Sequence, residues 1–107
     1  MRLQPAEREA IRSACAQTLP AGACVRLFGS RLDDLRRGGD IDLLIELPQP
    51  LPAEELVARR SRFAARLYRA LGEQRIDIVM TVAADAEPDP RPVVAEARRH
   101  GVELARA

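Results

Sequence analysis

Apolar residues recur at two different periods along this chain, and the two periods divide it into helices and strands. Recurrence every three or four positions predicts helices over residues 5–19, 53–71 and 90–100. Short runs rich in Val, Ile and Leu predict strands over residues 23–28, 40–47, 75–81 and 102–104. A further short helix is expected after residue 30, ending at a Gly-Gly pair. The pattern therefore predicts an α+β domain of order αβαβαβα(β), with a small mixed β-sheet flanked by helices.

The ends of these elements carry recognisable helix signals. Pro5 suits the first turn of the first helix, and Gly72 is expected to close the long one. Asp89 is expected to cap the last helix, with Pro90 as its first residue. Apolar residues on one face of the long helix predict its buried side, namely Leu56, Phe63, Ala64, Leu67 and Leu71.

Carboxylates stand out within the apolar strands. Asp40 and Asp42 open the second strand, and because strand side chains alternate they project to the same face. Asp77 interrupts the apolar third strand, where an unpaired buried carboxylate is costly. If the second and third strands are neighbours, the three acids share one face and need cations between them. Oxygen ligands beside a phosphate site favour Mg²⁺, so these aspartates are the predicted metal ligands and catalytic residues.

The turn before these acids has the features of a phosphate site. Gly29 lets the backbone approach phosphate oxygens, Ser30 offers a hydroxyl and an amide at a helix start, and Arg31 adds a fixed charge. The chemistry predicted is in-line attack of a hydroxyl on the α-phosphorus of a nucleoside triphosphate, with pyrophosphate leaving. Two Mg²⁺ ions would activate the attacking oxygen and neutralise the leaving group.

Composition narrows the class of protein further. A chain of 107 residues is the size of one domain, so residues 1–107 are read as a single unit. Its 17 basic residues are all Arg, which excludes the P-loop and Schiff-base chemistry, since both need lysine. A net charge of +1 is not that of a protein that coats nucleic acid, and direct nucleic-acid binding is not expected. Cys15 and Cys24 are expected to be reduced core residues. No apolar run predicts a membrane span or signal peptide, which favours the cytoplasm.

Taken together, Gly29-Ser30, a nine-residue spacer, Asp40-x-Asp42 and the later strand residue Asp77 resemble the DNA polymerase β-type nucleotidyltransferase superfamily. The short length and the ending at residues 92–102 resemble its minimal nucleotidyltransferase (MNT) branch. The resemblance implies the polymerase β-type fold and ATP as nucleotide substrate. It further implies a HEPN-domain toxin as partner, silenced by transfer of AMP onto a tyrosine of the toxin.

Other interpretations stay open beside this one. The chain could be a catalytically silent antitoxin that neutralises its toxin by complex formation, a reading favoured by Asp33 and Asp34, where relatives often carry a basic residue. Asp40 after two glycines also suits an ordinary turn. A row of arginines on the long helix is either a solvated face or a surface for an acidic partner or RNA, namely Arg59, Arg62, Arg66 and Arg69. Arg60 lies within the apolar arc, where it snorkels or reaches toward phosphate.

Overall fold

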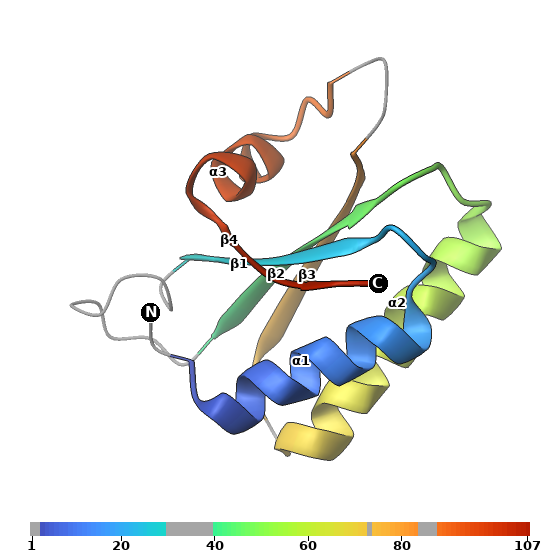
Figure 1. Cartoon of the computed structure of the whole chain (residues 1–107). Helices are drawn as coiled ribbons and strands as arrows, with labels where there is room; N and C mark the ends of the chain where they lie inside the picture. The colour runs from blue at the N-terminus through green and yellow to red at the C-terminus, as the bar shows by residue number, and fades with distance from the viewer. Residues whose placement is uncertain (1–2, 30–39, 73, 84–87) are drawn as a thin grey trace.

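The computed structural model describes residues 3–29, 40–72, 74–83 and 88–107. Four strands form one sheet of order β3-β2-β1-β4 (Figure 1). They are β1 (Cys24–Phe28), β2 (Ile41–Leu47), β3 (Ile76–Val82) and β4 (Val102–Arg106). β1 pairs antiparallel with both β2 and β4, whereas β2 and β3 are parallel. The α+β class with a mixed sheet and flanking helices is thereby confirmed.

In the described part of the chain, three helices cover the two faces of this sheet. α1 (Pro5–Thr18) and α2 (Ala53–Leu71) lie side by side on one face (Figure 1). Beneath them is the main core, in which Val25, Leu43 and Phe63 are fully buried. Burial of side chains of this size contributes about 1.5–3 kcal/mol each. α3 (Pro92–His100) packs on the other face against a smaller apolar cluster around Leu44.

Most of the predicted elements agree with the structure to within one or two residues. The long helix has the predicted bounds and ends at Gly72, whose φ of 76° is readily adopted by glycine. Both cysteines are free and buried, as expected. The short helix predicted after residue 30 lies outside the described residues. Within the described part of the chain, no helix is both long and apolar enough to cross a membrane.

The predicted start of the last helix is wrong. α3 begins at Pro92 with Arg91 as its N-cap, and Asp89 does not cap it. A residue that precedes proline is pushed out of the helical region, and Arg91 accordingly has φ −70° and ψ 126°. Asp89 instead accepts hydrogen bonds from the Thr81 hydroxyl (2.8 Å) and the Arg91 amide (3.0 Å). Its carboxylate therefore ties the loop to β3.

The open edge of β3 is covered by arginine side chains from three different segments. Arg60 of α2 donates to the carbonyl of Ile78 (3.2 Å), and Arg98 of α3 donates to that of Val82 (3.2 Å). Arg91 donates to the carbonyl between them, that of Met80. Unpaired carbonyls on an edge strand are a template for unwanted strand pairing, and these contacts satisfy them. Arg60 is thereby assigned to the strand edge.

Candidate active site

Strand pairing brings two of the predicted acids side by side. Asp42 is the second residue of β2 and stands opposite Asp77 of β3 in the parallel register. On its other side, Asp42 stands opposite Phe28, the last residue of β1. The condition on which the sequence argument depended, that the second and third strands are neighbours, is therefore confirmed.

Gly29 follows β1 directly and lies against the Asp42 side chain. A Cβ built on Gly29 would lie 2.2 Å from Oδ2 of Asp42, closer than any real contact. The φ of +80° at Gly29 is also in the region that favours glycine. Both observations mean that only glycine lets the chain turn this close to the carboxylate. The backbone after β1 and the acid on β2 form one compact unit.

The acids influence one another electrostatically. Burial raises the pKa of Asp42 above its usual range, and the negative charge of Asp77 raises it further. A hydrogen bond shared with Asp77 and the charge of Asp40 act in the same direction, while Arg75 opposes them. Burial is the main cause of this shift and the two neighbouring carboxylates add to it, so a cation beside Asp42 would favour its charged form.

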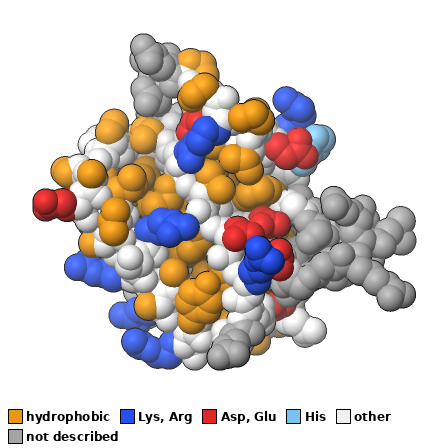
Figure 2. Space-filling view, turned by 180° about the vertical axis from the view of Figure 1, so that it is seen from behind, with side chains coloured by type: hydrophobic (Ala, Val, Ile, Leu, Met, Phe, Trp, Pro, Cys, Tyr) orange, Lys and Arg blue, Asp and Glu red, His pale blue; other side chains and the backbone are white. Residues whose placement is uncertain are grey.

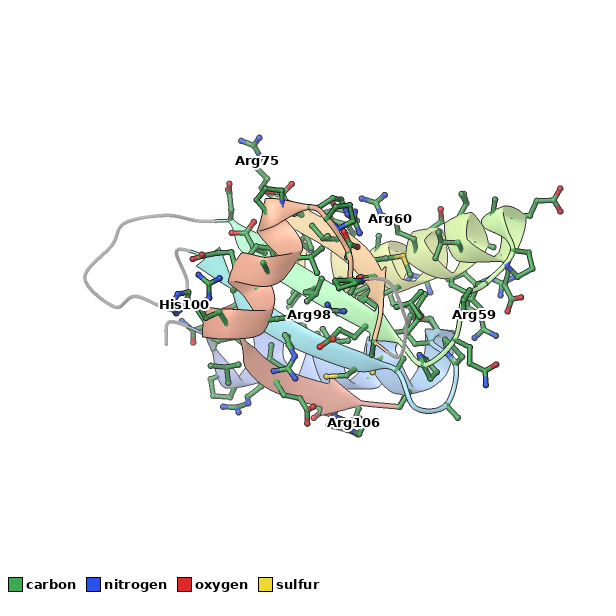
Figure 3. All side chains as sticks on the ribbon, turned by 90° about the horizontal axis from the view of Figure 1, so that it is seen from above. Arg59, Arg60, Arg75, Arg98, His100 and Arg106 are labelled. Atoms are coloured by element: carbon green, nitrogen blue, oxygen red, sulfur yellow. The ribbon has the colours of Figure 1, made fainter. Side chains whose placement is uncertain are left out.

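Asp40 lies immediately before β2 and is directed toward Arg75. Oδ2 of Asp40 is 3.8 Å from Nε of Arg75, and the two side chains are 43% and 77% exposed. An ion pair this long and this exposed contributes little to stability. Arg75 projects into solvent (Figure 3) and can leave Asp40 at little cost.

Arg75 is a residue that the sequence argument did not assign to the site. It precedes Asp77 by two positions, and its carbonyl accepts a hydrogen bond from the Ile41 amide (2.9 Å), which fixes the start of β2 beside it. The two-residue spacing from Asp77 was the available signal. The sequence alone does not show that the start of β2 lies beside it.

The predicted burial of Asp77 is wrong. The sequence predicts a carboxylate buried in a core strand, whereas the structure shows Asp77 exposed on β3, which is an edge strand. Its position therefore carries little desolvation cost, and the case for a functional role lies in its pairing with Asp42. Ser30 and Arg31, the predicted nucleotide-binding residues beside Gly29, lie outside the described residues.

The donor atoms at this site suit a hard divalent cation. Carboxylate oxygens are the ligands that Mg²⁺ prefers, and Asp40, Asp42 and Asp77 offer no nitrogen or sulfur. Among the described residues, however, no three His, Cys, Asp or Glu side chains are arranged so as to hold a metal ion. The chemistry of the donor set and the side-by-side carboxylates of Asp42 and Asp77 fit a metal, and Asp40, Asp42 and Asp77 are the residues that would hold it.

Figure 2 shows the face of the molecule on which acidic side chains gather next to arginine, beside exposed apolar side chains. A mixed sheet with two carboxylates in register, and a glycine turn pressed against one of them, is the arrangement that the resemblance to the polymerase β-type nucleotidyltransferases led us to expect.

Comparison with known families tests this resemblance. A family model described as a nucleotidyltransferase domain matches residues 8–99, most of the chain, and the protein belongs to that family. Domains of this family transfer nucleotidyl groups, typically with a nucleoside triphosphate and a divalent metal. No curated protein matches the chain in sequence.

Proposed function

We propose that this protein is a Mg²⁺-dependent nucleotidyltransferase that moves AMP from ATP to a hydroxyl group of a partner protein. The observation that carries this proposal is the placement of Asp42 beside Asp77, with Gly29 against the Asp42 carboxylate. Membership of the nucleotidyltransferase family supports the type of reaction. The nucleotide, the metal and the acceptor are our inference.

Each side chain has a role in this scheme. Asp40 and Asp42 would hold two Mg²⁺ ions, which when bound activate an attacking hydroxyl and neutralise the leaving pyrophosphate. Asp77 would complete the ligand set or accept the proton of the acceptor hydroxyl. Gly29 lets the backbone turn close to the Asp42 carboxylate, and Ser30 and Arg31 would bind the triphosphate.

The exposure of the acids argues for a macromolecular acceptor. Asp77 is exposed and Asp40 is 43% exposed, so the site opens onto the surface of the described structure. Small molecules are usually bound in concave pockets that enclose most of their surface. A hydroxyl carried on another protein reaches an open site without such a pocket. By the resemblance noted in the sequence, we propose a cytoplasmic HEPN-type toxin as that partner.

The test is transfer of label from α-³²P-ATP in the presence of Mg²⁺, with this protein alone and with the protein encoded beside it. We expect label on the partner, and none with Asp40→Ala/Asp42→Ala. Glu46→Gln serves as the matched control, because Glu46 lies on the same strand as Asp42 but is paired with arginines. Label that persists in the double aspartate variant would contradict the proposed role of these residues.

A second function is favoured by one observation, the direction of Asp40 toward Arg75. In that case the chain neutralises its partner by complex formation, without transfer. The two functions separate in a single binding experiment. Absence of label, with binding to the partner equally tight in wild type and in Asp40→Ala/Asp42→Ala, would establish the binding-only antitoxin.

A further inference from the structure

The arginine row on α2 is divided by its contacts into two groups. Arg59 donates to the carbonyl of Thr18 (3.0 Å) and pairs with Glu55 (3.2 Å), so it fastens α2 to α1. Figure 3 shows Arg59 and Arg60 on opposite sides of α2. By contrast, Arg62 and Arg69 are exposed and have no ion pair within the described part of the chain. The sequence could not distinguish these roles.

A groove lies beside the second group. It runs between α1 and α2, has a volume of about 270 Å³, and is lined by the small side chains of Ala10, Ser13 and Ala70. Arg66 and Arg69 line its α2 side, and Arg66 also donates a hydrogen bond to Oε1 of Gln17 across it. We call this feature the α1–α2 groove. Small residues along a groove allow another backbone to approach closely.

Positive charge dominates around this groove among the described residues. The acidic residues of α2 are confined to its first turn, at Glu54 and Glu55. On α1, Glu9 is paired with Arg12 (2.5 Å). Exposed arginines without a carboxylate partner raise the local potential and attract acidic groups. The groove and the charge occur together on one surface.

We propose that the α1–α2 groove docks an acidic helical segment of a partner protein, with Arg62, Arg66 and Arg69 pairing with its carboxylates. A helix that lies in a groove between two helices is a recurrent mode of recognition. Among the described residues, no aromatic side chain lines the groove to stack on bases, so the surface fits a protein better than single-stranded RNA.

The location of this groove has a consequence for the whole molecule. α1 and α2 cover the face of the sheet that carries Leu43 and Ile45, whereas Asp42 stands one residue out of step, on the opposite face. A segment docked in the groove therefore leaves the acids free. The inference does not depend on nucleotidyl transfer, since a binding-only protein would use the same surface.

The test uses the full-length protein and a fluorescein-labelled, alanine-based helical peptide that carries glutamates along one face. The same peptide with glutamine in place of glutamate is the control ligand. Binding is followed by anisotropy, and its location by amide chemical shifts. The variant Arg62→Glu/Arg69→Glu is compared with Arg8→Glu/Arg99→Glu, whose two arginines are also exposed and without an ion pair among the described residues.

Both double variants change the net charge by the same four units, so only the position of the change differs. We expect Arg62→Glu/Arg69→Glu to raise the dissociation constant of the acidic peptide at least about tenfold, and the control variant to change it less than about twofold. Shifts should cluster on residues 10–17 and 66–70. The proposal is overturned if both variants weaken binding equally, or if the glutamate and glutamine peptides bind alike. It is also overturned if a labelled 20-nucleotide RNA binds more tightly than the peptide through the same arginines.

Discussion

Asp42 and Glu46 are carboxylates on the same face of the same strand, four residues apart, but the charges beside them have opposite signs. Glu46 is 8% exposed and lies between two arginines, with Nε of Arg26 at 2.6 Å and Nε of Arg98 at 3.2 Å. Asp42 stands instead beside another carboxylate, that of Asp77, which contributes to its raised pKa. Between them Leu44 is fully buried under α3.

The difference shows how one strand can carry both a structural acid and the acid to which we assign a catalytic role. Glu46 is neutralised by fixed protein charges and joins β1, β2 and α3 together. Among the described residues, the cation that acts on Asp42 is the exposed Arg75, and the negative charges of Asp77 and Asp40 oppose its effect. A carboxyl group whose pKa is shifted by burial and by neighbouring charges is a candidate for a functional role.

The largest expected effect tests this division on activity. Asp42→Asn keeps the shape of the side chain but removes its charge, and we expect transferase activity to fall by about a thousandfold or more, as for loss of a metal ligand. Glu46→Gln should stay within about fivefold of wild type. Transfer of label under single-turnover conditions measures both. Comparable losses in the two variants would mean that Glu46 belongs to the site.

A change at Gly29 reaches Asp42 from the neighbouring strand. Gly29→Ala places a methyl group against Oδ2 of Asp42 and strains a backbone with φ +80°. We expect a loss of about 1–3 kcal/mol in the free energy of unfolding, and about a hundredfold in activity. Gly72→Ala is the control, because its φ is also positive (76°) but no atom lies within 4 Å of the added Cβ. The Gly72→Ala variant should lose stability and keep activity. Equal activities of Gly29→Ala and Gly72→Ala would mean that Gly29 is not part of the site.

Stability should respond in the opposite order from activity. Glu46→Ala leaves Arg26 and Arg98 without their shared partner, and we expect it to lower the free energy of unfolding by about 1–3 kcal/mol. Asp42→Ala removes a repelling charge from the metal-free protein and should cost less than about 1 kcal/mol. Urea unfolding with a chelator present measures both changes. A larger loss for Asp42→Ala would show that its carboxylate is structural.

The smallest effect is in the pH dependence of stability. Folding raises the pKa of Asp42, so the protonated form is favoured in the folded state and the stabilisation it gives is lost as pH rises through the folded pKa. Glu103 has the opposite sign: its bonds with Cys24 and Arg106 lower its pKa, and the associated stability is lost on acidification.

The contribution of Asp42 is isolated by subtraction. Without metal, the free energy of unfolding of wild type should fall relative to that of Asp42→Asn as pH rises from about 4. Saturating Mg²⁺ should reduce or reverse that trend, because a bound cation favours the charged carboxylate. A difference that does not vary with pH would mean that Asp42 is not perturbed by its neighbours.

The elements of the fold were largely readable in the sequence, and the failures have local causes. Periodicity located α2 and the four strands, since each must bury one apolar side. The predicted start of α3 was wrong because Pro90 and Pro92 both suit the first turn of a helix. Pro92 keeps Arg91 out of the helical region, so the helix begins only at Pro92. The contact of Asp89 with Thr81 depends on a strand eight residues away in the chain.

The site was readable only in part. Alternation predicted that Asp40 and Asp42 share a face, although β2 begins at Ile41, and their spacing from Gly29 produced the resemblance that the family match supports. The exposure of Asp77 and the position of Arg75 depend on β3 being an edge strand, and strand order cannot be predicted from a local sequence pattern. The separate roles of Arg59, Arg60 and Arg62 likewise follow from which neighbours α2 packs against.

The sequence by itself determined the alternation of helices and strands and predicted a shared face for Asp40 and Asp42, because these depend on side-chain periods within one segment. The tertiary structure alone decided that Asp42 stands beside Asp77 while Glu46 stands between arginines. Both are acids on one strand, and only strand order and helix packing bring a like charge to one and opposite charges to the other. The charged residues can be listed from the sequence, but whether a charge is compensated depends on the neighbours that the fold brings beside it.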